Sequence, residues 1–99
     1  MQELYNYGNA IVEEVETALE NGNFWEYLDE NALDIRYVAN AKRELLDCQI
    51  LVTFGGPNVW IDTEKNGVAV YWGSKQNVAP FHGDTKWEIL DYMEEYWRC

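Results

Sequence analysis

The chain has 99 residues, 47% of them hydrophobic and 15% aromatic. This length predicts one domain, residues 1–99, with a single core, and the composition excludes general disorder. Eighteen acids against seven Lys and Arg give a formal net charge of −11. That charge disfavours direct binding to nucleic acid or to an anionic membrane, and it favours a basic protein as the partner.

Targeting signals and cysteines give the expected location. No apolar run reaches the ~18 residues of a membrane-spanning helix. The N-terminal MQELYNYGNA has neither the basic start nor the apolar centre of a secretory signal. Cys48 and Cys99 do not make a disulfide framework, so we expect two free thiols in the reducing cytoplasm.

Two helices are predicted at the start of the chain. Residues 2–21 have helical periodicity, and Asn21-Gly22 is a typical helix end. The expected apolar stripe of this helix consists of Leu4, Tyr7, Ile11, Val15, Ala18 and Leu19. An aromatic segment that starts at Phe24 predicts a second helix of about two turns, residues 24–28.

The period then changes to two, which predicts strands at 33–39, 46–54, 59–61 and 68–72. Asn66-Gly67 is a hairpin signal. With a two-residue loop there, Ile61 would face Trp72 and Thr63 would face Val70, whereas a longer loop would alter this register. The two-residue loop also puts Trp60, Asp62 and Tyr71 on the opposite face.

The last part of the chain is predicted as a loop and a helix. Residues 73–83 form the loop, with one short extended piece at 78–81. The helix runs from Asp84, its expected N-cap, to Trp97. Its apolar stripe is expected to contain Trp87, Leu90, Met93 or Tyr92, and Trp97. The element order predicts an α+β fold, in which N-terminal and C-terminal helices pack on an antiparallel sheet of three to four strands.

Residues 54–58, FGGPN, form the most conspicuous loop motif. They lack the Lys-Ser/Thr of a phosphate-binding loop and no helix follows them. Gly, Pro and Asn together favour a turn between two strands. Residues 62–67, DTEKNG, are similar to the opening of a calcium loop, but position twelve, which should be a Glu, is Gly73. A hairpin is therefore the preferred interpretation.

Catalytic and metal-binding residues are scarce. His82 and Ser74 are the sole histidine and serine, and both fall in the least regular segment. A local pair between His82 and Asp84 is explained equally well by a helix start. Cys48 alternates with apolar neighbours, which predicts a buried and unreactive thiol. We expect no enzyme, no metal site and no cofactor.

Acidic residues are concentrated in the predicted helices. Residues 1–35 hold nine acids and no Lys or Arg, and residues 84–97 hold five acids against Lys86. One interpretation is a solvated surface that keeps a small protein soluble. The other is a surface for a basic partner, formed by Glu13, Glu14, Glu16, Glu20, Asp29, Glu30, Glu88, Asp91, Glu94 and Glu95.

Trp60 and Tyr71 are further candidates for binding, because aromatics with a polar end are common hot-spot anchors. This function requires that they are exposed. The alternative is that residues 73–83 or the N-terminal helix bury them.

The segments GGPNVWIDT and VYWG, followed by the acidic C-terminal helix, resemble small uncharacterised proteins of phages and conjugative elements in gut Firmicutes. This resemblance covers residues 33–97 and implies no residue roles. The overall profile is similar to anti-defence proteins such as antirestriction and anti-CRISPR inhibitors, several of which imitate DNA.

These observations lead to a functional hypothesis. The expected protein is a non-enzymatic inhibitor, a monomer or homodimer, that binds the basic nucleic-acid-binding surface of a defence protein. One alternative is an immunity protein or antitoxin that caps a basic toxin. Another is a small interaction module that binds a peptide or dimerises through its aromatic sheet face.

Overall fold

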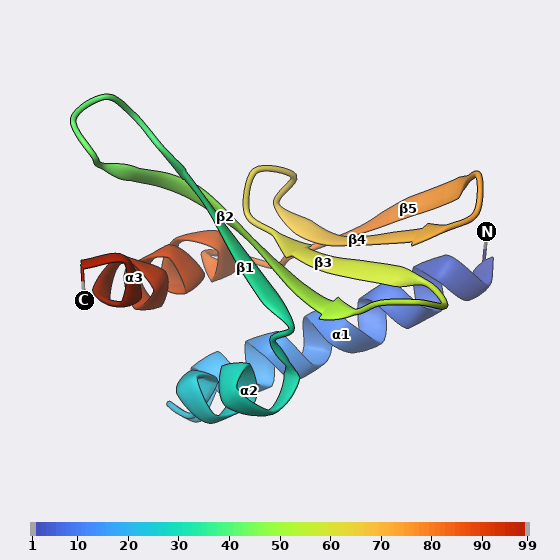
Figure 1. The fold of residues 1–99 in the computed structure, drawn as a ribbon. Helices are drawn as coiled ribbons and strands as arrows, with labels where there is room; N and C mark the ends of the chain where they lie inside the picture. Colours follow the sequence, from blue (N-terminus) through green and yellow to red (C-terminus); the bar gives the residue numbers. More distant parts are fainter. Residues whose placement is uncertain (1, 99) are drawn as a thin grey trace.

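The computed structural model describes residues 2–98 and has an α+β fold, as expected (Figure 1). Its elements are α1 (Gln2–Glu20), α2 (Phe24–Asn31), β1 (Asp34–Ala39), β2 (Leu45–Thr53), β3 (Asn58–Asp62), β4 (Gly67–Trp72), β5 (Lys75–Pro80) and α3 (Thr85–Arg98). The strands form one sheet in the order β1-β2-β3-β4-β5, and each neighbouring pair is antiparallel.

The sheet has five strands, so the prediction of three to four strands was too low. The additional strand is β5, which includes most of the short extended piece expected at 78–81 and begins three residues earlier, at Lys75. Gly73 has a φ of +60° in the tight turn that leads from β4 into β5. Ala79 is the single fully buried residue of this edge strand, so its sequence has no regular alternation to reveal it.

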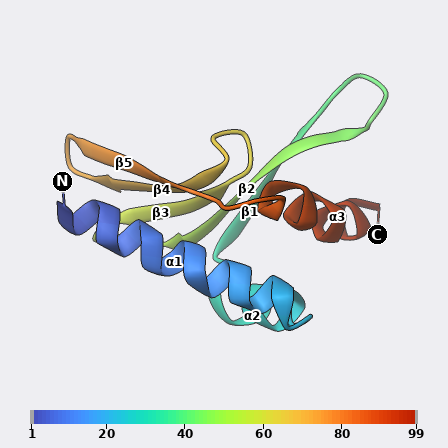
Figure 2. The same ribbon diagram turned by 180° about the vertical axis from the view of Figure 1, so that it is seen from behind.

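All three helices lie on one face of the sheet, and the other face carries no helix (Figures 1 and 2). α1 packs under β4 and β5, while α3 packs against β2. The core lies between the two layers. Its fully buried members include Val12, Val15, Phe24, Ile50, Val59, Ile61, Val68, Val70, Ile89 and Met93. None of the described helices is both long and apolar enough to cross a membrane.

The buried stripe of α1 is rotated slightly from the predicted one. Leu4, Val15 and Ala18 are buried, as predicted. Val12 is also completely buried, although it was not assigned to the stripe, and Tyr7 is 41% exposed. Gly8 permits this rotation, since a Cβ there would lie 3.1 Å from the Cβ of Ala79. The close approach of α1 to the sheet therefore turns Tyr7 toward solvent.

In α3, Leu90 and Met93 are buried, as predicted, but Trp87 is wrongly placed in the stripe. Its side chain is 61% exposed, and the ammonium of Lys86 lies 5.1 Å from its ring centroid. Ile89 takes its place in the core. Helical periodicity shows that apolar residues line one side of a helix, but it does not fix which side faces the core. The prediction chose the larger Trp87 for the core, whereas the structure buries the smaller Ile89.

In β2, Cys48 and Ile50 are buried, while Leu46 and Phe54 at the two ends of the predicted alternation are exposed. The β1–β2 hairpin extends beyond the rest of the sheet (Figure 1). Part of its apolar surface consequently lies outside the area that the helices cover.

The β3–β4 hairpin is confirmed, but the two-residue loop is wrong. Ile61 pairs with Val68, and Asp62 pairs with Gly67, so four residues form the loop. The carboxylate of Asp62 accepts hydrogen bonds from the backbone N–H groups of Glu64 and Lys65 at 3.0 and 3.3 Å. These bonds stabilise the wider turn, as short acidic side chains commonly do.

The FGGPN segment is a turn, as predicted. Residues 54–57 join β2 to β3. Gly55 has a φ of +100°, which disfavours any other residue. The side-chain oxygen of Asn58 accepts a hydrogen bond from the Gly55 N–H at 3.3 Å.

Candidate partner-binding surface

The outward side of the helices carries most of the predicted binding residues. Nine of the ten acidic candidates are exposed: Glu13, Glu14, Glu20, Asp29, Glu30, Glu88, Asp91, Glu94 and Glu95. We call the outward surface of α1, α2 and α3 the acidic helical layer. α1 packs beside α2 and α3, and the three helices that carry these acids lie on the same face of the sheet (Figure 2).

An open groove between α1 and α2 brings four carboxylates together. Glu13 and Glu14 line it from α1, and Glu26 and Glu30 line it from α2. Sequence reasoning did not select Glu26, although its spacing of four from Glu30 places the two on one helix face. Tyr27 also lines the groove. Burial, followed by the negative charge of Glu14, raises the pKa of Tyr27 well above its usual value.

Glu16 differs from the other candidates because it joins α1 to the start of α3. Its Oε2 accepts a hydrogen bond from the His82 backbone N–H at 2.7 Å. Its Oε1 lies 2.9 Å from Nδ1 of His82. The Thr85 hydroxyl lies 2.8 Å from Oε2 and 2.6 Å from the His82 carbonyl oxygen, so two acceptors compete for one hydrogen. Glu16 therefore has a structural role, and the His82 ring contacts Glu16 rather than Asp84.

The pKa of Glu16 reflects this position. Partial burial alone would raise it, but the hydrogen bonds from His82 and Thr85 outweigh burial and hold the pKa below its usual 4.5. A depressed carboxyl pKa stabilises the fold above the unfolded-state value, and this contribution disappears as the pH falls through the folded-state value.

Glu16→Gln is expected to reduce the free energy of unfolding by about 1 kcal/mol at pH 7, because the bonds to a charged acceptor are partly exposed. Urea unfolding at pH 7 and at pH 3.5 would measure the effect. The difference between wild type and variant should shrink at the lower pH. Glu13→Gln, on the same helix, is the control and should change stability by less than about 0.5 kcal/mol. Equal effects of the two variants would contradict the role of Glu16.

The C-terminal helix contacts the turn at the tip of the projecting β1–β2 hairpin. Glu94 and Trp97 line a depression together with Lys42 and Arg43 of the β1–β2 turn. The indole N–H of Trp97 donates to the Arg43 carbonyl oxygen at 3.2 Å, and its ring lies 5.0 Å from that of Tyr37. This end of the acidic helical layer therefore meets basic side chains, whereas α1 and α2 contain none.

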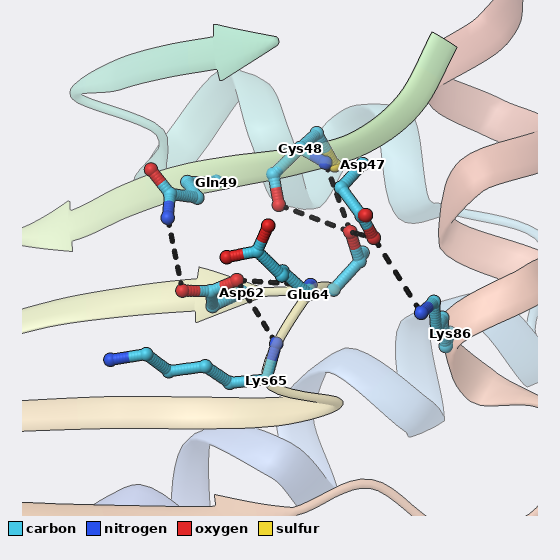
Figure 3. A network of polar contacts seen from close by, with 8 residues as sticks. Asp47, Cys48, Gln49, Asp62, Glu64, Lys65 and Lys86 are labelled. Atoms are coloured by element: carbon cyan, nitrogen blue, oxygen red, sulfur yellow. Dashed lines mark hydrogen bonds and ion pairs between the residues drawn. The ribbon is translucent and has the colours of Figure 1, made fainter. Parts of the chain in front are cut away.

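A polar network fixes the β3–β4 turn against β2 and α3 (Figure 3). Thr63 is completely buried, and its hydroxyl donates to Asp47 at 2.8 Å and accepts from the Cys48 N–H at 2.9 Å. Lys86 of α3 forms an ion pair with Asp47 at 3.6 Å. Asp62 is 2% exposed and accepts from the Gln49 amide at 3.1 Å. The network therefore joins β2, the β3–β4 turn and the start of α3.

Trp60 and Tyr71 lie on the same face of the sheet, as the hairpin predicted, and this is the face without helices. Both are half-buried, and Tyr71 pairs with Gln76 of β5, so residues 73–83 flank it as one alternative expected. The guanidinium of Arg36 lies 4.7 Å from the centroid of Trp60, and the ammonium of Lys65 lies 5.2 Å from that of Tyr71. The pair is accessible, but cation–π contacts reduce its apolar surface.

Cys48, which was considered as a nucleophile, lies in the core of the protein. Cys48 is completely buried, and burial raises the pKa of its thiol to about 12. Such a thiol is protonated and unreactive at neutral pH. Cys99 lies outside the described residues. Within residues 2–98 no three His, Cys, Asp or Glu side chains are grouped as metal ligands would be.

Comparisons with protein-family models, with curated proteins and with solved structures found no match to this chain.

Proposed function

We propose that this protein is a non-enzymatic inhibitor that binds the basic, nucleic-acid-binding surface of another protein through its acidic helical layer. The observation that carries the proposal is the separation of charge. The first 35 residues contain nine acids and no base, and the fold arranges α1 and α2 from this segment on the side opposite the open sheet face.

The spacing of the acids suits a surface built for a polyanion. Acids three or four residues apart recur every ~4.5 to 6 Å along a helix, and DNA phosphates recur every ~3.4 Å along one strand. A second acidic helix beside the first adds further carboxylates, so the average distance between negative charges comes closer to the distance between the phosphates of a duplex. The groove between α1 and α2 adds carboxylates from both helices, which would attract arginine and lysine side chains of a partner.

The proposal includes a cytoplasmic location and a monomer or homodimer. A net charge of −11 would steer the association, since opposite charge raises association rates at low salt. An immunity protein or antitoxin would use the same surface. The identity of the partner distinguishes the two, because a nuclease toxin would be captured in place of a defence protein.

Two triple variants with equal net charge test the proposal. The first triple changes Glu13, Glu20 and Glu88 to Gln and so removes three negative charges from the acidic helical layer. Asp34→Asn, Glu44→Gln and Glu64→Gln neutralise three exposed acids on the sheet and its turns. Each triple changes the formal charge from −11 to −8, since three acids are lost.

The partner would be captured from host lysate at low salt, identified by mass spectrometry and then titrated. Three partly exposed pairs at about 0.5 kcal/mol each predict about tenfold weaker binding for the helical triple. The sheet triple should stay within about threefold, and high salt should weaken binding of the wild type. Capture of no basic protein, or equal losses in the two triples, would refute the proposal.

A further inference from the structure

A cavity of about 250 Å³ lies at the end of the molecule where α1 begins. The β2–β3 and β4–β5 turns lie beside the start of α1 in both views (Figures 1 and 2). The buried residues Leu4 and Val70 form the inner wall, and Pro57 closes one side. Tyr7 and Trp72 supply aromatic walls. We call this site the aromatic cavity.

The aromatic walls are unusually exposed for their size. Trp72 is 56% exposed and Tyr7 is 41% exposed. Phe54, in the β2–β3 turn at the same end, is 73% exposed. Single exposed apolar residues are normal in soluble proteins, but a group of them around a cavity marks an interaction site.

Glu3 and Lys75 are the charged residues at the cavity. Neither forms an ion pair with another residue of the described range 2–98. Glu3 is the first acid of the segment without bases, so the cavity adjoins the acidic helical layer along α1. A basic partner that lies along α1 would therefore pass over an apolar cavity with an unpaired carboxylate beside it.

The volume of the cavity limits the size of the group that it can bind. Sites for drug-sized molecules have volumes of about 300 to 1,000 Å³. A cavity below that range suits one large side chain, and buried apolar anchors in pockets dominate many protein interfaces.

We propose that the aromatic cavity binds one large apolar side chain of the basic partner, next to a lysine or arginine that pairs with Glu3. In this proposal, the ammonium group of Lys75 donates a hydrogen bond to a backbone carbonyl of the same partner segment. This inference rests on the proposed function for the partner, and it adds a hydrophobic anchor to an otherwise electrostatic contact.

Three capped tripeptides test the cavity without the partner: acetyl-Lys-Leu-Lys-amide, acetyl-Lys-Gly-Lys-amide and acetyl-Glu-Leu-Glu-amide. Each is titrated into ¹⁵N-labelled protein while the indole N–H signal of Trp72 is followed. The Lys-Leu-Lys peptide should shift this signal and bind about tenfold more tightly than either other peptide. Glu3→Gln should reduce its preference over Glu-Leu-Glu.

Trp72→Ser should abolish the Lys-Leu-Lys binding. Because this variant has no indole at position 72, its binding is followed through the backbone amide signals of Tyr7 and Lys75, which also line the cavity. Trp87→Ser is the matched control, because Trp87 is comparably exposed on α3 and lies outside the cavity. Equal binding of the leucine and glycine peptides, or unchanged binding to Trp72→Ser, would overturn the inference.

The captured partner separates this inference from the proposed function. If Trp72→Ser binds the partner as tightly as wild type while the helical triple does not, the cavity inference is wrong and the proposed function stands. If the Lys-Leu-Lys peptide binds and no basic protein is captured, the cavity is supported and the proposed function is refuted.

Discussion

Phe24→Ala is expected to lower the free energy of unfolding by about 3–5 kcal/mol, which is the usual cost of removing a buried phenyl ring. Phe24 is completely buried at the start of α2. Its ring centroid lies 6.1 Å from that of Tyr27 and 5.3 Å from that of Tyr92, so it joins α2 to α3. Domains of this size are stable by only about 5–15 kcal/mol, and the variant should unfold at much lower urea.

Phe54→Ala provides the matched control. Phe54 is 73% exposed in the β2–β3 turn, so its removal should change stability by less than about 0.5 kcal/mol. Urea unfolding followed by circular dichroism measures both variants. A loss at position 24 as small as that at position 54 would show that α2 does not pack as described.

Gly67→Ala is expected to destabilise the protein by about 1–3 kcal/mol through overpacking. A Cβ at Gly67 would approach the Ala79 carbonyl oxygen and would lie 2.9 Å from Cγ1 of Val78. Because a backbone atom is in the way, β4 and β5 would have to separate. The effect therefore reports directly on β5, the edge strand of which the sequence predicted only a short extended piece at 78–81.

Gly56→Ala is the control for that experiment, and its expected sign is opposite. Nothing lies within 4 Å of a Cβ at Gly56, and its φ is not in the left-handed region. Alanine there restricts the unfolded chain and should stabilise the protein by up to about 1 kcal/mol. If both substitutions proved neutral in thermal unfolding, the close contact between β4 and β5 would be wrong.

The two kinds of candidate surface differ in how far the sequence could define them. Apart from Glu16, the candidate acids of α1 and α2 are exposed, because charged residues opposite an apolar helix stripe face solvent. The roles of Glu16 and Glu26 were not predictable, since Glu16 meets His82 from 66 positions away and Glu26 meets α1 across the groove. The aromatic cavity was missed altogether, because Tyr7 and Trp72 come from elements far apart in the chain.

The Asn66-Gly67 pair shows the same limit on a smaller scale. The motif correctly located a hairpin, but the prediction took Asn66 and Gly67 as the two residues of the loop. Gly67 in fact begins β4 and pairs with Asp62, where close approach to β5 requires a residue without a side chain. Asn66, with a φ of +55°, is the last loop residue.

By itself, the sequence determined the α+β class, most of the elements, the buried Cys48 and the acidic character of the helices. These features depend on local periodicity and composition, which act over a few residues. The tertiary structure decided the fifth strand, the direction in which Trp87 and Tyr7 point, the structural use of Glu16 and the cavity beside Trp72. Each of these depends on which distant surfaces meet, and close packing between layers settles that through contacts that no local pattern records.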